Sequence, residues 1–166
     1  MKVQLSTAIG DILLELDNSK APKTVKNFLS YMNSGHYEGT IFHRVIKGFM
    51  IQGGGLDVNM NTKPAPDLVE NEANNGLSNL KGTIAMARTT EPHSASSQFF
   101  INTADNLFLN HKSETDDGWG YCVFGKIIAS DEIIEKIEET PTVTRAGHQD
   151  VPDNVIIIEN ITTINE

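Results

Sequence analysis

Arg44 lies in a run of strand-forming apolar residues, which is an unusual place for a permanent cation. In the stretch IFHRVIKGFMIQGGG at 41–55, strand alternation places Arg44 on one face with Phe42 and Ile46. A guanidinium is rarely fully buried unless it is paired. Either this strand face is open to solvent, or Arg44 is directed at a ligand.

Two amide side chains occupy similar positions in strand-like runs. Met50 and Gln52 share one face in FMIQ, and Gln98 and Phe100 share one in SQFF. Each pair alone fits a strand with one solvent-facing side. Together with Arg44 they supply one fixed cation, two amides and several large apolar groups, without an acid–base pair, a nucleophile or a metal ligand set. This inventory favours binding a peptide and stabilising one of its conformations over making or breaking bonds.

Other candidate motifs have simpler interpretations. The glycines that begin at Gly53 lack the Gly-Lys-Ser/Thr of a phosphate-binding loop, so we interpret them as turn glycines. The stretch NHKSETDDGWG at 110–120 combines His111 with acidic residues, but no rigid element positions them, which favours a solvated loop over a metal site. His43 and His93 have no Ser or Cys nearby in a nucleophile setting, so no hydrolase triad is predicted.

Length, charge and cysteine content limit the classes of protein. The chain has 166 residues and a net charge of −9, from 22 acidic and 13 basic residues. We expect one domain over 1–166, without nucleic-acid or membrane partners, because no cluster of basic residues exceeds a pair and no run approaches the ~20 apolar residues of a membrane span. The single cysteine, Cys122, excludes an internal disulfide and is expected to be buried. We predict a cytoplasmic monomer that uses no metal or cofactor.

The hydrophobic patterns predict several strands and two isolated helices. A helix opens at Pro22 and closes at Gly35, a second covers 131–138, and 53–80 reads as a long loop. The expected strands flank a turn at Ile9-Gly10 and then occupy 41–46, 49–52, 82–87, 97–102, 121–128 and 154–162. Because helices and strands do not alternate, an antiparallel barrel or sandwich with helices at its ends is favoured over a parallel sheet.

Three runs carry a resemblance to a known family. FHRVIKGFMIQGG, GTIAMARTTEPHSASSQFFIN and GWGYCVFGKI resemble the cyclophilin family of peptidyl-prolyl cis-trans isomerases, above all its bacterial cytosolic branch. The resemblance extends from about Gly10 to Ile161, in order and without a large gap. It implies a mainly β fold, in which a closed eight-stranded antiparallel barrel is capped by two α-helices and the substrate groove lies on the outer face.

The resemblance also implies roles for individual residues. Arg44 matches the catalytic arginine of the family. The positions that match or flank its substrate groove are Phe49, Met50, Gln52, Ala87, Arg88, Gln98, Phe100, Phe108, Leu109 and Tyr121. The implied partners are proline-containing peptides and unfolded or folding proteins.

Three positions depart from the eukaryotic pattern, in which Arg88 would be asparagine, Phe108 tryptophan and Tyr121 histidine. The change at Arg88 should be tolerated if the contact there runs through the backbone. The other two imply weak cyclosporin binding and leave isomerase activity intact.

Two other functions remain open from the residues. A peptide-binding chaperone module could use the same groove to hold unfolded chains without turnover, although the presence of Arg44 and Gln52 favours catalysis. A small-ligand barrel would require an apolar interior cavity, whereas the distinctive residues here alternate with expected core positions.

Overall fold

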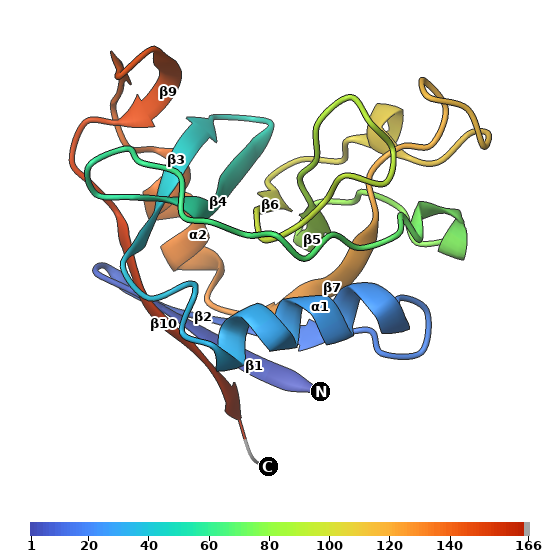
Figure 1. The fold of residues 1–166 in the computed structure, drawn as a ribbon. Helices are drawn as coiled ribbons and strands as arrows, with labels where there is room; N and C mark the ends of the chain where they lie inside the picture. The colour runs from blue at the N-terminus through green and yellow to red at the C-terminus, as the bar shows by residue number, and fades with distance from the viewer. Residues whose placement is uncertain (165–166) are drawn as a thin grey trace.

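A closed antiparallel barrel forms the body of the protein, whose computed structural model describes residues 1–164 (Figure 1). Around the barrel the strands follow the order β1-β10-β3-β4-β6-β5-β7-β2. Their bounds are β1 (Lys2–Thr7), β2 (Gly10–Leu16), β3 (Thr40–Ile46), β4 (Met50–Asp57), β5 (Thr83–Met86), β6 (Phe99–Asn102), β7 (Val123–Ala129) and β10 (Ile157–Ile164). The predicted eight-stranded barrel is confirmed.

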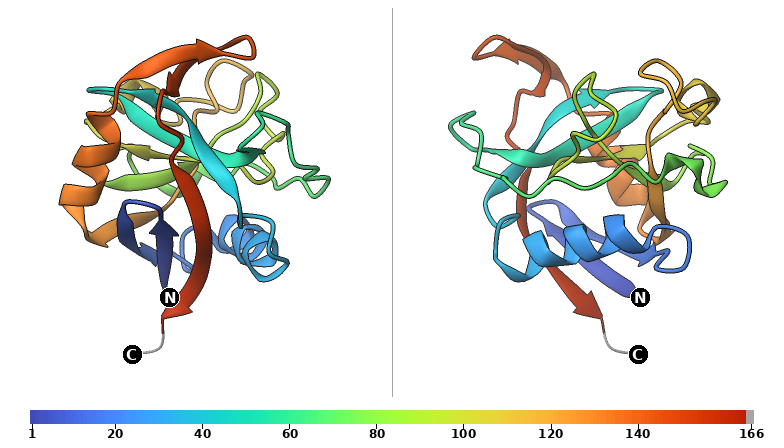
Figure 2. Two further views of the ribbon diagram at one scale, coloured as in Figure 1. Left: turned by 90° about the vertical axis from the view of Figure 1, so that its left-hand side faces the viewer. Right: turned by 45° about the vertical axis from the view of Figure 1, so that its right-hand side comes forward.

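Two helices pack on different sides of the barrel, as the sequence predicts (Figure 2). They are α1 (Pro22–Asn33) and α2 (Asp131–Glu138), and two short 3-10 turns, η1 (Ala73–Asn75) and η2 (Leu107–Leu109), lie in the long loops. In α1 the fully buried Phe28 places its ring 5.2 Å from that of Phe124 and 5.9 Å from that of Phe99. Ile134 and Ile137 of α2 are also buried. Aromatic and aliphatic packing of this kind fixes both helices on the barrel.

The sheet beside β4 is apolar on both faces. Strand pairing aligns Ile51 with Ile101, and Ile101 with Ile84, in a row whose side chains are all fully buried in the barrel interior. The next row aligns Gln52 with Phe100 and then Ala85, whose side chains lie on the outer face. Because side chains alternate across a strand, the interior row obliges the outer row to face away from the core. The outer row therefore contributes to a second apolar cluster on the barrel surface.

The three glycines that begin at Gly53 lie within strand β4, so their interpretation as turn glycines is wrong. A side-chain carbon built on Gly54 would lie 2.8 Å from the ring of Phe99, and one on Gly55 would lie 2.3 Å from the side chain of Gln98. Such distances are far below van der Waals contact, so these positions exclude any side chain. The glycines serve close packing between strands, and the loop predicted from 53 begins only after β4.

A hairpin that the sequence analysis missed lies beside β3. It consists of β8 (Thr142–Arg145) and β9 (His148–Pro152), joined by a turn in which Ala146 and Gly147 have φ angles of 51° and 80°. The hairpin contacts β3 and lies over one end of the barrel (Figure 2, left). Most of its side chains are exposed, so it lacks the apolar alternation that signals a strand.

A register shift in β3 redirects the side chains around Arg44. The pairing of β3 with β4 is irregular between Phe42 and Arg44, a position typical of a β-bulge. Phe42 is fully buried in the interior while Arg44 is exposed, so the predicted common face of Phe42, Arg44 and Ile46 is wrong. Strict alternation would also separate His43 from Arg44, but both line a hollow of about 290 Å³ that the turn of the hairpin borders.

His43 is held neutral in this position. Its side chain is 5% exposed, and within residues 1–164 its Nδ1 atom has no hydrogen-bond partner. The ring of His148, from β9, lies 6.2 Å from that of His43. Burial, together with the nearby His148 and Arg44, lowers the pKa of His43 to about 4. The protonated form is therefore disfavoured in the folded protein.

We predict that His43 makes folding stability depend on pH in the acid range. Its pKa is about 4 in the folded protein and about 6.5 in an unfolded chain, so the unfolded state binds more protons at low pH. The stabilisation is fully present above about pH 6.5 and is lost as the pH falls through about 4. Between pH 7 and 5 this loss amounts to about 2 kcal/mol. Urea unfolding at pH 7, 6 and 5 measures it.

The matched variant for this test is His43→Gln, which cannot titrate. Its free energy of unfolding should fall less steeply between pH 7 and 5 than that of the unmodified protein. Equal slopes for His43→Gln and the unmodified protein would contradict the assignment.

Candidate functional site

A small hollow opens on the outer face of the barrel, above the second apolar cluster. Its volume is about 130 Å³, room for about four water molecules and thus of the size of a small side-chain ring. Nine side chains line it: Arg44, Phe49, Met50, Gln52, Ala87, Arg88, Phe100, Leu109 and Tyr121. Sequence analysis named all nine as site residues, and the structure brings them together from β3, β4, β6, η2 and the ends of β5 and β7.

The floor and one wall of the hollow are apolar. Met50 and Phe100 are almost entirely buried, at 2% and 4% exposure, because they belong to the outward-facing row of their strands. The ring of Tyr121 meets the ring of Phe100 edge-on at 5.8 Å. At the rim, Phe49 stacks on Phe108 at 5.9 Å. An apolar group placed here would lose most of its contact with water.

Arg44 supplies a positive charge beside this apolar floor. Its residue is exposed, and it pairs in register with Gln52 across β3 and β4. The Nε2 atom of Gln52 donates a hydrogen bond to Oε1 of Gln98 at 3.0 Å, and Gln98 itself packs against Gly55. The amide of Gln52 is thereby oriented, and its oxygen remains available to accept a hydrogen bond from the guanidinium of Arg44 or from a bound peptide.

Two predicted site residues do not line the hollow itself. Gln98 acts behind it, through its hydrogen bond to Gln52. Phe108 lies on η2 and is 63% exposed, so it extends the rim outward from Phe49. Gln98 therefore supports a lining residue, Gln52, whereas Phe108 adds an exposed ring next to Phe49.

Arg88 lies on the opposite side of the hollow, where backbone and ring contacts hold its guanidinium. Its Nε donates to the carbonyl oxygen of Gly120 at 3.0 Å, and its Nη1 donates to that of Thr89 at 2.8 Å. Its guanidinium carbon lies 4.5 Å from the centroid of the Tyr121 ring, a cation–π distance. The tyrosine and the arginine that distinguish this sequence from the eukaryotic pattern therefore form one unit.

A chain of buried asparagines, which sequence analysis missed, connects the segment that carries Phe49 with the segment that carries Tyr121. The side-chain amide of Asn106 donates to the carbonyl oxygen of Phe49 at 2.9 Å and to the side chain of Asn102. Asn102 in turn donates to Asn79 at 3.0 Å. Asn79 donates to the carbonyl oxygen of Tyr121 at 3.2 Å. Each of the three asparagines is at most 4% exposed. A satisfied network in a low-dielectric setting holds its members rigidly. The clue in the sequence is the spacing of two asparagines in NTADN, which begins at the last residue of a predicted strand.

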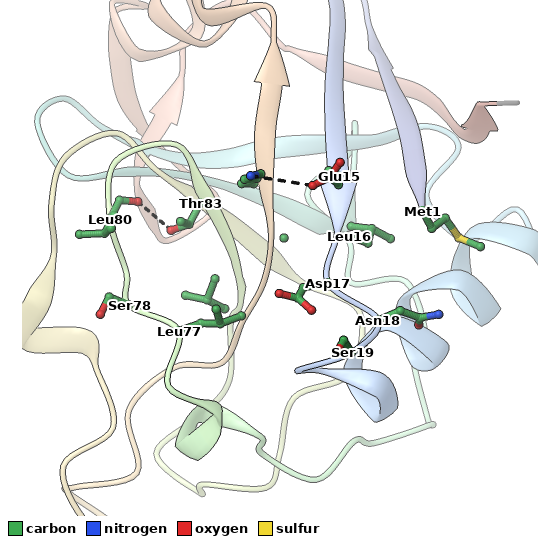
Figure 3. Close-up of a pocket in the computed structure, with 13 residues that line it drawn as sticks. Met1, Glu15, Leu16, Asp17, Asn18, Ser19, Leu77, Ser78, Leu80 and Thr83 are labelled. Carbon is green, nitrogen blue, oxygen red and sulfur yellow. Dashed lines mark hydrogen bonds and ion pairs between the residues drawn. The ribbon is translucent and has the colours of Figure 1, made fainter. Parts of the chain in front are cut away.

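A larger hollow of about 550 Å³ lies elsewhere on the barrel (Figure 3). It shares no lining residue with the hollow beside Arg44, and none of the predicted site residues reach it. Its wall carries Glu15 and Lys126, whose charged atoms lie 3.9 Å apart across β2 and β7.

The chemistry available at the site is electrostatic and apolar. Cys122, next to Tyr121, is buried as predicted, and burial raises the pKa of its thiol to about 11, so it does not act as a nucleophile at neutral pH. Within residues 1–164, no three His, Cys, Asp or Glu side chains gather as a metal-binding group. None of the described helices has the length and apolar character needed to cross a bilayer.

Comparison with known proteins adds the family. The profile of the cyclophilin type peptidyl-prolyl cis-trans isomerase/CLD family matches residues 2–163. The chain is 54% identical over 158 residues to peptidyl-prolyl cis-trans isomerase cyp18 of Streptomyces antibioticus, covering 95% of each protein. It is 52% identical over 160 residues to peptidyl-prolyl cis-trans isomerase B of Escherichia coli (strain K12), covering 96% of this chain and 98% of that protein.

A solved structure shares the same fold over the full length of both chains. The cyclophilin type peptidyl-prolyl cis-trans isomerase of Cryptosporidium parvum, crystallised in the presence of the dipeptide Ala-Pro, is 32% identical to this chain. The TM-score is 0.81, and all of this chain and all of that chain are covered. Sequence profile, relatives and fold agree: the chain belongs to the cyclophilin-type peptidyl-prolyl cis-trans isomerases and is an enzyme of that class.

Proposed function

We propose that the enzyme holds the proline ring of an X-Pro peptide in the hollow beside Arg44 and directs the guanidinium at the prolyl nitrogen. Its substrates are proline-containing peptides and unfolded or folding proteins. One observation carries the proposal: Arg44, exposed and without a carboxylate partner within residues 1–164, borders an apolar hollow of ring size.

The reaction requires rotation about one bond and no change of covalent structure. Resonance gives the peptide C–N bond a rotation barrier of about 18–20 kcal/mol. Before proline, the cis and trans forms differ by only about 0.5–1 kcal/mol, yet they exchange over tens to hundreds of seconds. An enzyme therefore accelerates exchange if it stabilises the twisted state more than either planar state.

Arginine suits this task because the prolyl nitrogen changes character during rotation. In the planar amide its lone pair is delocalised into the carbonyl, and in the twisted amide the lone pair returns to the nitrogen. A donor directed at that nitrogen then forms a hydrogen bond that the planar states lack, which is differential stabilisation of the transition state. The guanidinium remains protonated throughout, and it does not transfer its proton.

The neighbouring groups have distinct supporting roles. Gln52, oriented by Gln98, accepts a hydrogen bond from the guanidinium or holds the peptide on the Arg44 side. Met50 and Phe100 provide an apolar floor for the pyrrolidine ring. Exclusion of water from this floor strengthens the interaction between Arg44 and the nitrogen, since charges interact more strongly in a low-dielectric setting.

The two other functions considered from the sequence lead to different observations. A chaperone module would bind X-Pro peptides in the same hollow without accelerating their exchange. A small-ligand barrel would need an open interior, whereas the fully buried side chains of Phe42, Phe99 and Phe124 belong to the cluster that occupies it. A protease-coupled assay on a short X-Pro peptide separates catalysis from binding alone.

Replacement of Arg44 by alanine is expected to leave the fold intact and to remove most of the activity. Loss of one preorganised donor to a transition state costs about 2.7–4 kcal/mol, equivalent to a 10²–10³-fold fall in rate. The measurement is kcat/KM on an X-Pro peptide, with circular dichroism as the check of folding. Arg145→Ala, which removes the arginine paired with Asp153 outside the hollow, is the control and should retain full activity. A folded Arg44→Ala protein with half the original kcat/KM would refute the mechanism.

The activity should be nearly independent of pH between about 6 and 9. The proposed step moves no proton, and Arg44 stays charged because the pKa of arginine exceeds ~12. His43, the nearest imidazole along the chain, has a pKa of about 4 and remains neutral over this range. The test is kcat/KM against pH for an uncharged peptide. A bell-shaped profile with limbs inside this range would indicate a general acid and base instead.

We further propose that cyclosporin binds weakly and that Phe108→Trp tightens its binding. Phe108 is exposed at the rim, and an indole there would add ring area and an N–H donor. The gain should be roughly tenfold in Kd, since one hydrogen bond contributes about 1 kcal/mol and the larger ring adds buried area. Titration by intrinsic fluorescence or calorimetry measures it. Leu107→Trp, which places an indole on the neighbouring exposed position, is the control, and equal affinities for both variants would exclude this role of position 108.

A further inference from the structure

The arginines of this protein are distributed unevenly with respect to its carboxylates. The sequence contains three arginines among 22 acidic residues. Arg145 lies 3.7 Å from a carboxylate oxygen of Asp153. Arg44 and Arg88 both line the hollow, and within residues 1–164 neither lies in an ion pair with Asp or Glu. In so acidic a chain, two unpaired arginines at one hollow form a local positive site.

Arg44 has a role in the proposed mechanism, whereas Arg88 does not. Arg88 is half-buried, and its Nε and Nη1 atoms donate to the carbonyl oxygens of Gly120 and Thr89. Carbonyl oxygens orient a guanidinium without neutralising its charge. No hydrogen bond within residues 1–164 engages the second terminal nitrogen, Nη2. The guanidinium is therefore held in place on the Tyr121 ring and retains both its charge and a donor.

The two glutamates of the segment that borders Arg88, Glu70 and Glu72, already have other partners. Glu70 lines a small cleft together with Arg88, but its carboxylate pairs with Lys23, and this pairing lowers the pKa of Glu70. Glu72 accepts hydrogen bonds from the backbone N–H groups of Lys23 and Thr24 at the start of α1. Neither carboxylate is ion-paired with Arg88, so this segment leaves the charge of its guanidinium unpaired.

We propose that Arg88 is a carboxylate subsite, which makes the enzyme prefer X-Pro peptides that carry an acidic side chain within two residues of the proline. The proposal rests on the proposed function, because it places the proline ring in the hollow that Arg88 borders. A peptide advances at most about 3.6 Å per residue, so residues flanking the proline pass along the rim of so small a hollow. Arginine is suited to binding carboxylates because its planar guanidinium can donate one hydrogen bond to each of the two carboxylate oxygens.

The experiment compares peptides that differ only in one side chain, Glu, Gln or Lys. The variable residue stands one or two positions before the proline, or one position after it, in peptides with blocked ends. Exchange spectroscopy by NMR gives kcat/KM and Kd for each peptide. In at least one position we expect Glu to be favoured over Gln by about two- to fivefold at low salt, the effect of a partly exposed ion pair. The preference should disappear at high ionic strength.

Variants at position 88 identify the residue responsible, and the ratio between peptides is the readout. In Arg88→Gln the Glu/Gln ratio should fall to about one, whatever the absolute rate. Arg88→Glu should invert the preference, so that Lys is favoured over Gln. Lys126→Gln removes one positive charge at the larger hollow and should keep the original ratio. A purely structural role of Arg88 would not invert the preference.

The outcomes separate this proposal from the one on which it rests. If the Gln peptides are not accelerated, the catalytic proposal fails, and the ratio of Kd values for Glu and Gln peptides still tests the subsite. If the Gln peptides are accelerated but no position shows a preference for Glu, the subsite is refuted and catalysis stands. A preference that survives in Arg88→Gln would assign the carboxylate to Arg44 and would likewise overturn the role of Arg88.

Discussion

The close packing of Gln98 against the backbone of Gly55 is the contact on which the geometry of the site depends. No side chain fits at position 55, so the Gln98 side chain lies directly over strand β4. From there it accepts a hydrogen bond from Gln52, which in turn is the register partner of Arg44. A larger residue at 55 would displace Gln98 and release the amide of Gln52. The glycines of β4 thus contribute to the orientation of the charged group, although they touch no substrate.

The second requirement is a sheet that is apolar on both faces. Most antiparallel sheets have one solvated face, and here the outer face carries Met50 and Phe100 at nearly full burial. The loop around η2 and Tyr121 covers part of this outer layer, and Met50 and Phe100 line the hollow beside Arg44. The asparagine chain from Phe49 to Tyr121 ties those covering segments together. Barrel and loops therefore contribute separate walls of one site.

The sequence allowed the barrel, both helices and the group of site residues to be predicted, because hydrophobic periodicity and the family motifs are local in the chain. Errors arose where tertiary contacts override the local pattern. The alternation of side chains along a strand could not reveal the bulge in β3. Because of this bulge, Phe42 faces the interior, and His43 and Arg44 line the same hollow. The glycines after Gly53 suggest a turn unless the approach of Phe99 is known. The exposed hairpin of β8 and β9 has no apolar pattern to detect.

The bulge in β3 also explains how an imidazole can lie next to the proposed catalytic cation. If the side chain at position 43 were an exposed histidine, it would gain and lose charge near neutral pH next to Arg44. Burial of His43 in the hollow next to β9 moves its titration to about pH 4, and the positive charge of Arg44 helps to keep it there. The same cation that is proposed to act on the substrate therefore stabilises the neutral state of its neighbour. The imidazole of His43 therefore stays uncharged beside Arg44 near neutral pH.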